Sequence, residues 1–256
     1  MKLPLLISVP HGGLSIPEEL QPFLKIGPEL IEKASDQGSF EIYSGLEGRV
    51  ERYLFADIAR VLVDVNRAAD NRKPDGVIKT RTSGKLVYDP YPDAETIETV
   101  IARYHAPYHR ELARLSRIDG VRLGVDCHTM FELAPDDAPD PKGSPRPMIC
   151  LSDGAGTTLP AGWMDRLTVI FRKEFEGFDV GVNKPFNGGH IIRSHSLNLP
   201  WLQIEISRLS LLSSEAKGAR VLAALTQFCE ETFETRPAPA ACRLIAWFRR
   251  LLTKAA

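Results

Sequence analysis

Two histidines and one aspartate have the residue types that bind a catalytic zinc ion. His11 and His128 each follow a hydrophobic segment that is typical of a strand, and Asp36 lies near the start of a predicted helix. Catalytic zinc commonly takes three protein ligands and leaves a fourth position for water. We therefore expect His11, Asp36 and His128 to hold one Zn²⁺ ion.

Asp126 lies two residues before His128, so both side chains point to the same side of an extended strand. A carboxylate in this place can accept a hydrogen bond from the ring of a metal-bound histidine and so fix its orientation. The alternative is a carboxylate that only ends a strand or a turn.

Glu205 is a carboxylate inside an apolar strand, between Ile204 and Ile206. Burying a carboxylate is costly unless it has a partner or a chemical task. If Glu205 faces a metal-bound water, it can serve as general base and then donate the proton to the leaving nitrogen. The alternative is a structural ion pair with Arg208 or another cation.

Two arginines, Arg60 and Arg67, have the residue type that binds anions. The β-branched segment 59–65 predicts a strand, and its alternation places Arg60, Asp64 and Asn66 on one face, with Arg67 at the end. Arg60 can stabilise an oxyanion. Arg67 is suited to bind a carboxylate in a bidentate manner, through two parallel N–H···O hydrogen bonds. The alternative is an Arg60–Asp64 ion pair on an exposed edge.

A loop from Asn183 to Arg193 contains Gly188 and Gly189. Two glycines permit positive φ or a close approach of the backbone, so this loop either lines a pocket or merely turns the chain. His105 and His109, four residues apart on a predicted helix, have the spacing of a metal pair. We interpret them as part of a partly exposed helix face.

Alternating strands and helices predict a three-layer α/β fold. Strands are expected at 5–9, 59–65, 120–126, 148–151, 180–182 and 202–207, and helices at about 28–46, 93–117, 164–175 and 215–232. A long surface excursion is expected over 70–92. Ligands of such sheets gather beyond the carboxyl ends of strands, which is where His11, Asn66 and His128 are expected.

The chain has 256 residues, of which 43% are hydrophobic and 25% are charged. This length fits one α/β domain, expected over residues 1–235, followed by a linker and a basic helix over 236–256. The 32 Lys and Arg residues balance 33 Asp and Glu residues, giving a net charge of -1. This balance argues against a dedicated nucleic-acid-binding protein.

The N-terminal segment MKLPLLISVPHGG has an apolar run that stops at Pro10–His11, and no signal-peptidase-like site follows it. No apolar stretch approaches the roughly 18 residues that span a bilayer. The four cysteines are widely spaced, which favours reduced thiols. We therefore expect a cytoplasmic protein with no stable membrane insertion.

Six segments, in order from about residue 3 to 215, together resemble the N-formylglutamate amidohydrolase family. They are Val9–Gly13, Arg60–Arg67, Tyr104–His109, Asp126–His128, Asn183–Gly189 and Gln203–Ile206. The resemblance implies a fold similar to zinc carboxypeptidases and aspartoacylases, with a mixed sheet between helices. It also implies hydrolysis of N-formyl-L-glutamate to formate and glutamate, a step of histidine breakdown.

The resemblance implies metal ligation by His11 and His128 and acid–base work by Glu205. Arg60 and Asn66–Arg67 would hold the oxyanion and a substrate carboxylate. Arg193 is a candidate for the second carboxylate of a glutamate moiety, in the loop with Asn183, Gly188 and Gly189.

This chain departs from the pattern of carboxypeptidase-like sites, which take their first two ligands from H-x-x-E. Leu14 stands three residues after His11, so the second ligand must come from elsewhere. Asp36 fits the aspartate that follows the first motif in the family, with Glu18, Glu19 and Glu41 as alternatives. His190 stands where the family usually has an aromatic residue after the two glycines, which leaves the acyl group open.

Two other functions remain open. One keeps the chemistry but acts on another N-acyl amino acid or small amide. The other is a non-catalytic ligand-binding protein with the same fold, although a binding protein would have no need of a base such as Glu205. The expected partner is a small anionic N-acyl amino acid, and a homo-oligomer is possible.

Overall fold

The computed structural model describes residues 2–136, 138 and 140–233. Six strands form one sheet in the order β2-β1-β5-β8-β6-β7. Their bounds are β1 Leu3–Val9, β2 Val50–Phe55, β5 Leu123–Met130, β6 Ile149–Ser152, β7 Val180–Val182 and β8 Trp201–Ser207. Neighbouring strands run parallel except β6 and β8, which are antiparallel. The sheet is therefore mixed, as expected.

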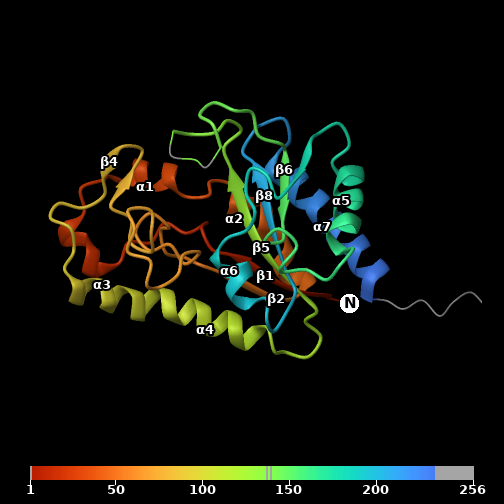
Figure 1. Cartoon of the computed structure of the whole chain (residues 1–256), viewed down its shortest axis with the longest axis horizontal. Coiled ribbons are helices and arrows are strands. Elements are labelled where there is room, and N and C mark those ends of the chain that lie inside the picture. Colours follow the sequence, from red (N-terminus) through yellow and green to blue (C-terminus); the bar gives the residue numbers. More distant parts are fainter. Residues whose placement is uncertain (1, 137, 139, 234–256) are drawn as a thin grey trace, which may run out of the picture.

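Helices cover both faces of this sheet (Figure 1). Their bounds are α1 Pro28–Ala34, α2 Ser39–Tyr43, α3 Ala94–Val100, α4 Ala106–Leu115, α5 Trp163–Glu174, α6 His190–His195 and α7 Ser214–Phe233. Short 3₁₀ turns lie at Glu18–Phe23 and Ser44–Arg49, and a π-helical turn at Ile101–His105 joins α3 to α4. A small hairpin, β3 Arg81–Thr82 and β4 Lys85–Leu86, lies apart from the main sheet.

Two apolar cores, one on each face of the sheet, hold the three layers together. Leu5, Ile7 and Val9 of β1 pack in the core with α2, α5 and α7, whereas Leu6 packs in the other core with α3, α4 and α6. Alternate residues of a strand point to opposite faces, so the apolar residues of β1 serve both cores. The three-layer α/β architecture is confirmed.

The predicted strand over 59–65 is wrong. The segment forms turns, in which the backbone N–H groups of Leu62 and Val63 both donate to the carbonyl of Ala59. Its apolar residues are still buried, in the core beside α3 and α4. β2, at Val50–Phe55, takes the place beside β1 instead. Val61 and its neighbours are apolar because they are core residues, and burial alone does not distinguish a strand from a buried turn.

Two smaller corrections bear on the site. The helix expected over 28–46 is interrupted between α1 and α2, and Asp36 lies in that interruption. His128 lies inside β5 rather than after it, because the strand extends to Met130. All eight residues of β5 are buried, so its polar side chains need partners inside the protein.

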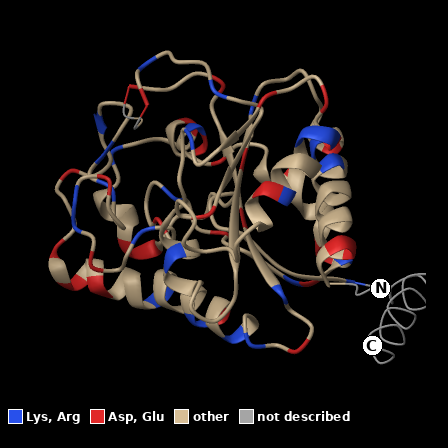
Figure 2. Cartoon of the chain, turned by 45° about the vertical axis from the view of Figure 1, so that its right-hand side comes forward, with Lys and Arg blue, Asp and Glu red and all other residues tan. Residues whose placement is uncertain are grey.

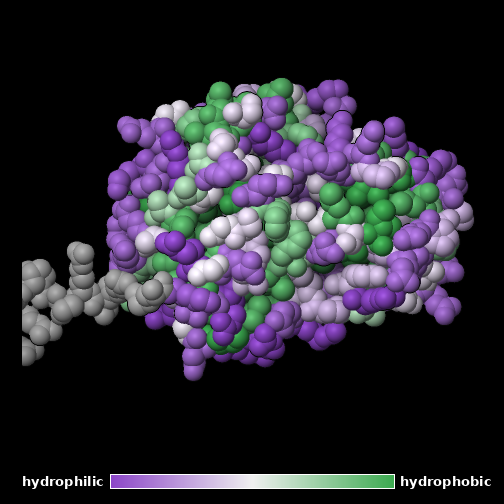
Figure 3. Space-filling model, turned by 180° about the vertical axis from the view of Figure 1, so that it is seen from behind, coloured by the Kyte–Doolittle hydropathy of each residue, from purple (hydrophilic) through white to green (hydrophobic). Residues whose placement is uncertain are grey.

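The surface mixes both charges and both polarities. Basic and acidic residues are interspersed, with acidic residues on α3 and basic ones along α4 (Figure 2). Seen from behind, apolar patches are separated by polar side chains (Figure 3). Within the residues that the structure describes, no helix has the length and apolar character needed to cross a membrane. The segment 236–256 lies outside the described residues, and its proposed helix stays a prediction.

Candidate metal centre

His11, Asp36 and His128 converge at the carboxyl edge of the central strands. His11 follows β1, and His128 lies on the adjacent parallel strand β5. The backbone N–H of Asp36 donates to the carbonyl of His11 at 3.0 Å, which fixes the turn between α1 and α2 against the end of β1. One ligand atom from each of the three residues lies within 4.8 Å of the others, and all three residues are buried.

The Nδ1 atoms of both imidazoles face the same carboxylate oxygen. Asp36 Oδ2 lies 2.9 Å from His128 Nδ1 and 3.5 Å from His11 Nδ1. His11 Nδ1 is buried and makes no hydrogen bond within the described residues. An unsatisfied buried nitrogen costs about 1–3 kcal/mol unless something pairs with it. This nitrogen beside a carboxylate oxygen and a second imidazole fits a divalent cation such as Zn²⁺.

The second nitrogen of each ring is held by a buried carboxylate. His11 Nε2 donates to Asp64 Oδ1 at 2.8 Å, and His128 Nε2 donates to Asp126 Oδ2 at 2.9 Å. These bonds leave both Nδ1 atoms for the centre, the arrangement that orients metal-binding histidines and makes them more basic. Asp64 has a role here that differs from the proposed edge ion pair, although it does lie 3.4 Å from Arg60.

The charges around the centre favour ionised carboxylates. Burial by itself would raise the pKa of Asp36, but Arg60, which donates to its Oδ1 at 2.8 Å, and His11 together hold that pKa well below its ordinary value. Burial likewise opposes ionisation of Asp64, and Lys79 with His11 lowers its pKa overall. Both carboxylates are therefore available as anions at neutral pH.

Glu205 lies beside the centre on β8, in register with His128 on β5. It is 8% exposed and accepts a hydrogen bond from Gln203 at 3.0 Å. Burial raises its pKa to about 7, with His128 partly offsetting the rise. Within the described residues it forms no ion pair, and Arg208, the expected partner, donates to the Ser35 carbonyl at 2.6 Å. A carboxyl group that titrates near neutrality can both accept and donate a proton.

The other proposed metal ligands lie elsewhere. Arg103 pairs with Glu19 at 2.9 Å and approaches Glu18 at 3.8 Å, and Glu41 is exposed on α2. Among the described residues, only His11, Asp36 and His128 form a group that could hold a metal ion.

Asn66 connects the centre to the glycine loop. Its Nδ2 donates to Asp126 Oδ2 at 3.3 Å, and its Oδ1 accepts from the N–H of Ile191 at 2.8 Å. A Cβ atom at Gly189 would lie 2.3 Å from Asn66 Nδ2, so a side chain there would collide with this contact. The glycine is required for the close approach of the loop, one of the two roles expected from its residue type.

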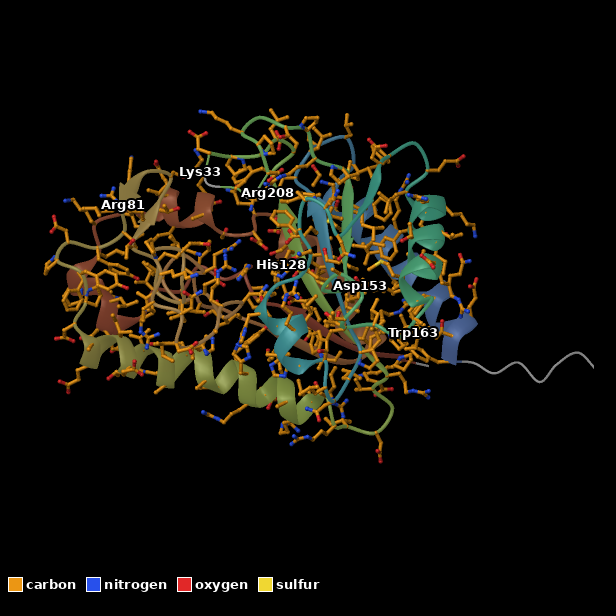
Figure 4. The ribbon with its side chains drawn as sticks, viewed as in Figure 1. Lys33, Arg81, His128, Asp153, Trp163 and Arg208 are labelled. Carbon is orange, nitrogen blue, oxygen red and sulfur yellow. The ribbon has the colours of Figure 1, made fainter. Side chains whose placement is uncertain are left out.

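The centre lies at the base of a cleft of about 1150 Å³. Arg60, Asn66 and Arg67 line this cleft together with His11, His128, Gly188, Gly189, Gln203 and Glu205. In Figure 4, His128 lies centrally, below Lys33 and Arg208, which also line the cleft. Arg67 is turned toward Asp75, to which its Nη2 donates at 2.8 Å.

Two of the proposed substrate-binding residues are not among the described residues that line the cleft. Arg193 Nη2 donates to Asn187 Oδ1 at 3.0 Å, and Asn183 Nδ2 donates to Asp153 Oδ1 at 2.8 Å. Both side chains brace neighbouring loops. Their contacts with substrate stay predictions.

The interpretation of a partly exposed helix face is wrong for His105, which is buried, whereas His109 is half-buried. Their Nε2 atoms donate to the carbonyls of Arg67 and Val65, each at 2.8 Å, and so hold the backbone on both sides of Asn66. His109 Nδ1 accepts from His195 Nε2 at 2.9 Å. The Tyr104–His109 motif could have drawn attention to both histidines, but it does not predict which carbonyls they bind.

Replacing His109 with Leu should weaken zinc binding, though by less than the roughly 10- to 100-fold typical of a group bonded directly to a metal ligand, because His109 acts on His11 only through the segment that holds Asp64. The change leaves the Val65 carbonyl unpaired and releases the segment that holds Asp64 and Asn66. A zinc titration followed by competition with a chelator measures it. His190→Leu is the matched control, since His190 contacts the His109 ring at 5.3 Å without holding that carbonyl. Equal zinc affinity in both variants would refute the positioning role.

The fold of this chain is similar to those of known proteins whose structures have been solved. An N-formylglutamate amidohydrolase from Ralstonia eutropha is similar in structure, with a TM-score of 0.76 and 22% sequence identity over 93% of this chain and 96% of that one. A gene product from Agrobacterium tumefaciens is also similar, with a TM-score of 0.72 and 15% identity over 91% of each chain. At these identities the likeness shows the fold.

No curated protein matches the chain. The family model of N-formylglutamate amidohydrolase matches residues 3–212, a span that contains the metal centre, Glu205 and the cleft-lining Arg60 and Arg67. The chain therefore belongs to the N-formylglutamate amidohydrolase family.

Proposed function

We propose that this protein is a zinc-dependent hydrolase of the amide bond in an N-formyl amino acid, with N-formyl-L-glutamate as substrate and formate and L-glutamate as products. One observation supports it above the rest: two imidazole Nδ1 atoms and the Asp36 carboxylate meet beside a buried Glu205 with a pKa of about 7. Membership of the family supports the substrate. A place in histidine breakdown and in the cytoplasm belongs to the same proposal.

His11, Asp36 and His128 would hold the metal ion. When bound, Zn²⁺ supplies a Lewis acid for the substrate carbonyl and lowers the pKa of a bound water from about 15.7 toward about 7. The remaining roles fall to side chains of this chain.

Glu205 accepts the proton of the attacking water as the new C–O bond forms at the formyl carbon. It then donates that proton to the amide nitrogen as the C–N bond breaks, so that glutamate leaves as the amine. Arg60, which lines the cleft and donates to Asp36, stabilises the oxyanion. Asn66 and Arg67 anchor the carboxylate of the amino acid.

A hydrolysis screen tests the proposal. Purified protein loaded with zinc is assayed for formate release from N-formylglutamate and N-formylaspartate, and for acetate release from N-acetylglutamate. We expect the highest kcat/KM with N-formylglutamate. Faster turnover of another member of the series would keep the chemistry and replace the substrate. Absence of hydrolysis with bound zinc would favour a ligand-binding protein.

The value of kcat/KM should rise with pH and then level off, with the midpoint of the rise at or below about pH 7. Glu205 must be deprotonated to accept a proton, so activity is gained as pH rises through its pKa of about 7. A bound cation would stabilise the carboxylate and move this limb to lower pH, never to higher pH. Rates at constant zinc saturation between about pH 5 and pH 9 measure it. Activity that falls steadily from pH 5 to 7 would contradict a carboxylate base.

A further inference from the structure

Three cations on the walls of the cleft have no acidic partner at hydrogen-bonding distance within the described residues. Lys33 forms no ion pair, Arg81 donates only to the carbonyl of Gly84 at 3.1 Å, and Arg208 comes no closer than 3.9 Å to a carboxylate. Lys33 lies in the last turn of α1, Arg81 lies on β3, and Arg208 follows directly after β8. In Figure 4, Arg208 lies just above His128, and Lys33 and Arg81 lie above it and farther to the left.

Other cations of the same cleft are neutralised by the protein itself. Arg60 pairs with Asp36 and Asp64, and Arg67 with Asp75. Lys79 lies between Asp64 and Asp75 and pairs with both. The contrast separates Arg60, Arg67 and Lys79, which the protein's own carboxylates neutralise, from Lys33, Arg81 and Arg208, which keep their positive charge.

Arg208 is the most constrained of the three unpaired cations. Its side chain is 13% exposed and its guanidinium lies 4.2 Å from the centre of the Phe131 ring. Nη2 and Nε are bonded to Ser35 and Thr129, whereas Nη1 is buried without a partner. A buried guanidinium N–H that the protein leaves unpaired is available to an anion that enters the cleft.

The cleft is also larger than N-formylglutamate requires. Pockets of roughly 300–1,000 Å³ hold drug-sized ligands, and this cleft measures about 1150 Å³. An N-formyl amino acid is much smaller than such ligands. The segment that contains Asp75, the partner of Arg67, continues through Lys79 to Arg81. Arg81 therefore adds an unpaired positive charge to the cleft that also contains Arg67, the proposed anchor of the amino-acid carboxylate.

We propose that the cleft takes N-formyl amino acids extended at their carboxyl end by further acidic residues, with Lys33, Arg81 and Arg208 binding the added carboxylates. The substrate class is thus a short N-formylated acidic peptide, of which N-formylglutamate is the smallest member. This inference rests on the proposed amide hydrolysis and concerns how far the substrate reaches.

The test compares N-formyl-Glu-Glu with N-formyl-Glu-Gln, two peptides of equal size that differ in one carboxylate. We expect wild-type kcat/KM to favour the acidic peptide by about 10-fold, because single exposed ion pairs contribute up to a few-fold each. The preference should shrink as salt rises, since exposed charges are screened. The double variant Lys33→Gln/Arg81→Gln should bring the ratio close to one. Both side chains are exposed, so the fold is expected to persist, and a thermal melt checks it.

Lys85→Gln is the matched control, an exposed lysine on β4 of the same hairpin that is not among the described cleft residues. It should keep the wild-type ratio. Equal kcat/KM for the two peptides in wild-type protein, or a ratio that the double variant leaves unchanged, would overturn this inference. If N-formylglutamate is still hydrolysed in that case, the proposed function stands. If neither peptide nor N-formylglutamate releases formate, both proposals fail.

Discussion

Glu205→Gln should lower kcat by about 100- to 10,000-fold, the range that a positioned general acid–base group contributes. Glutamine fills the same space and can still bond to Gln203, but it cannot take a proton from water. Its neighbours in β8 are all buried, so the isosteric change should preserve the strand. Zinc content should be unchanged, because Glu205 is not in the His11–Asp36–His128 group. Formate release and zinc analysis on one preparation measure both quantities.

The matched control for this experiment is Glu132→Gln. Glu132 is an exposed carboxylate just beyond β5, and it is not among the described residues of the cleft. Its replacement should leave kcat within about two-fold of wild type, as is usual for surface changes. A Glu205→Gln variant as active as this control would remove Glu205 as the base.

Asp36→Asn should lower zinc affinity by more than about 100-fold, since loss of an outer partner of a ligand alone costs about 10- to 100-fold. The amide keeps the shape of the side chain but loses the charge that lies between the two imidazoles. Arg60 then lacks one of its carboxylate partners, so activity should fall as well. Equilibrium dialysis against zinc measures the first effect.

The alternative ligands provide the controls for Asp36. Glu41→Gln and Glu19→Gln should retain wild-type zinc affinity, because Glu41 is exposed and Glu19 pairs with Arg103. A protein that keeps one zinc ion after Asp36→Asn but loses it after either control would place the third ligand elsewhere.

The sequence predicts the strands that pass through the core. β1, β6, β7 and β8 are mostly apolar, and each occurs within about two residues of its expected position. β2 is not predicted, because Val50–Phe55 is mostly half-buried and includes Glu51 and Arg52, so its hydrophobic pattern is weak. Segment 59–65 has the stronger pattern but forms turns. Hydrophobicity reports burial, while the choice of strand depends on which segment pairs with β1.

The sequence likewise predicts part of the candidate site. His11, His128 and Glu205 stand out because each is a polar residue attached to an apolar strand, and the structure brings them together. The orienting role of Asp64 could not be deduced, since its bond to His11 spans 53 positions and depends on a turn that the sequence suggests to be a strand. The contacts of His105 and His109 with backbone carbonyls could not be predicted from the sequence, because every residue has a carbonyl and residue type does not indicate which one a histidine contacts.

The most direct test of a metal ion held by His11, Asp36 and His128 is a crystal structure of the zinc-loaded protein with anomalous data collected at the zinc edge. The predicted result is a single strong peak about 2.0–2.2 Å from His11 Nδ1, His128 Nδ1 and an oxygen of Asp36. A fully loaded, active protein whose peak lies away from these atoms would contradict the proposed centre.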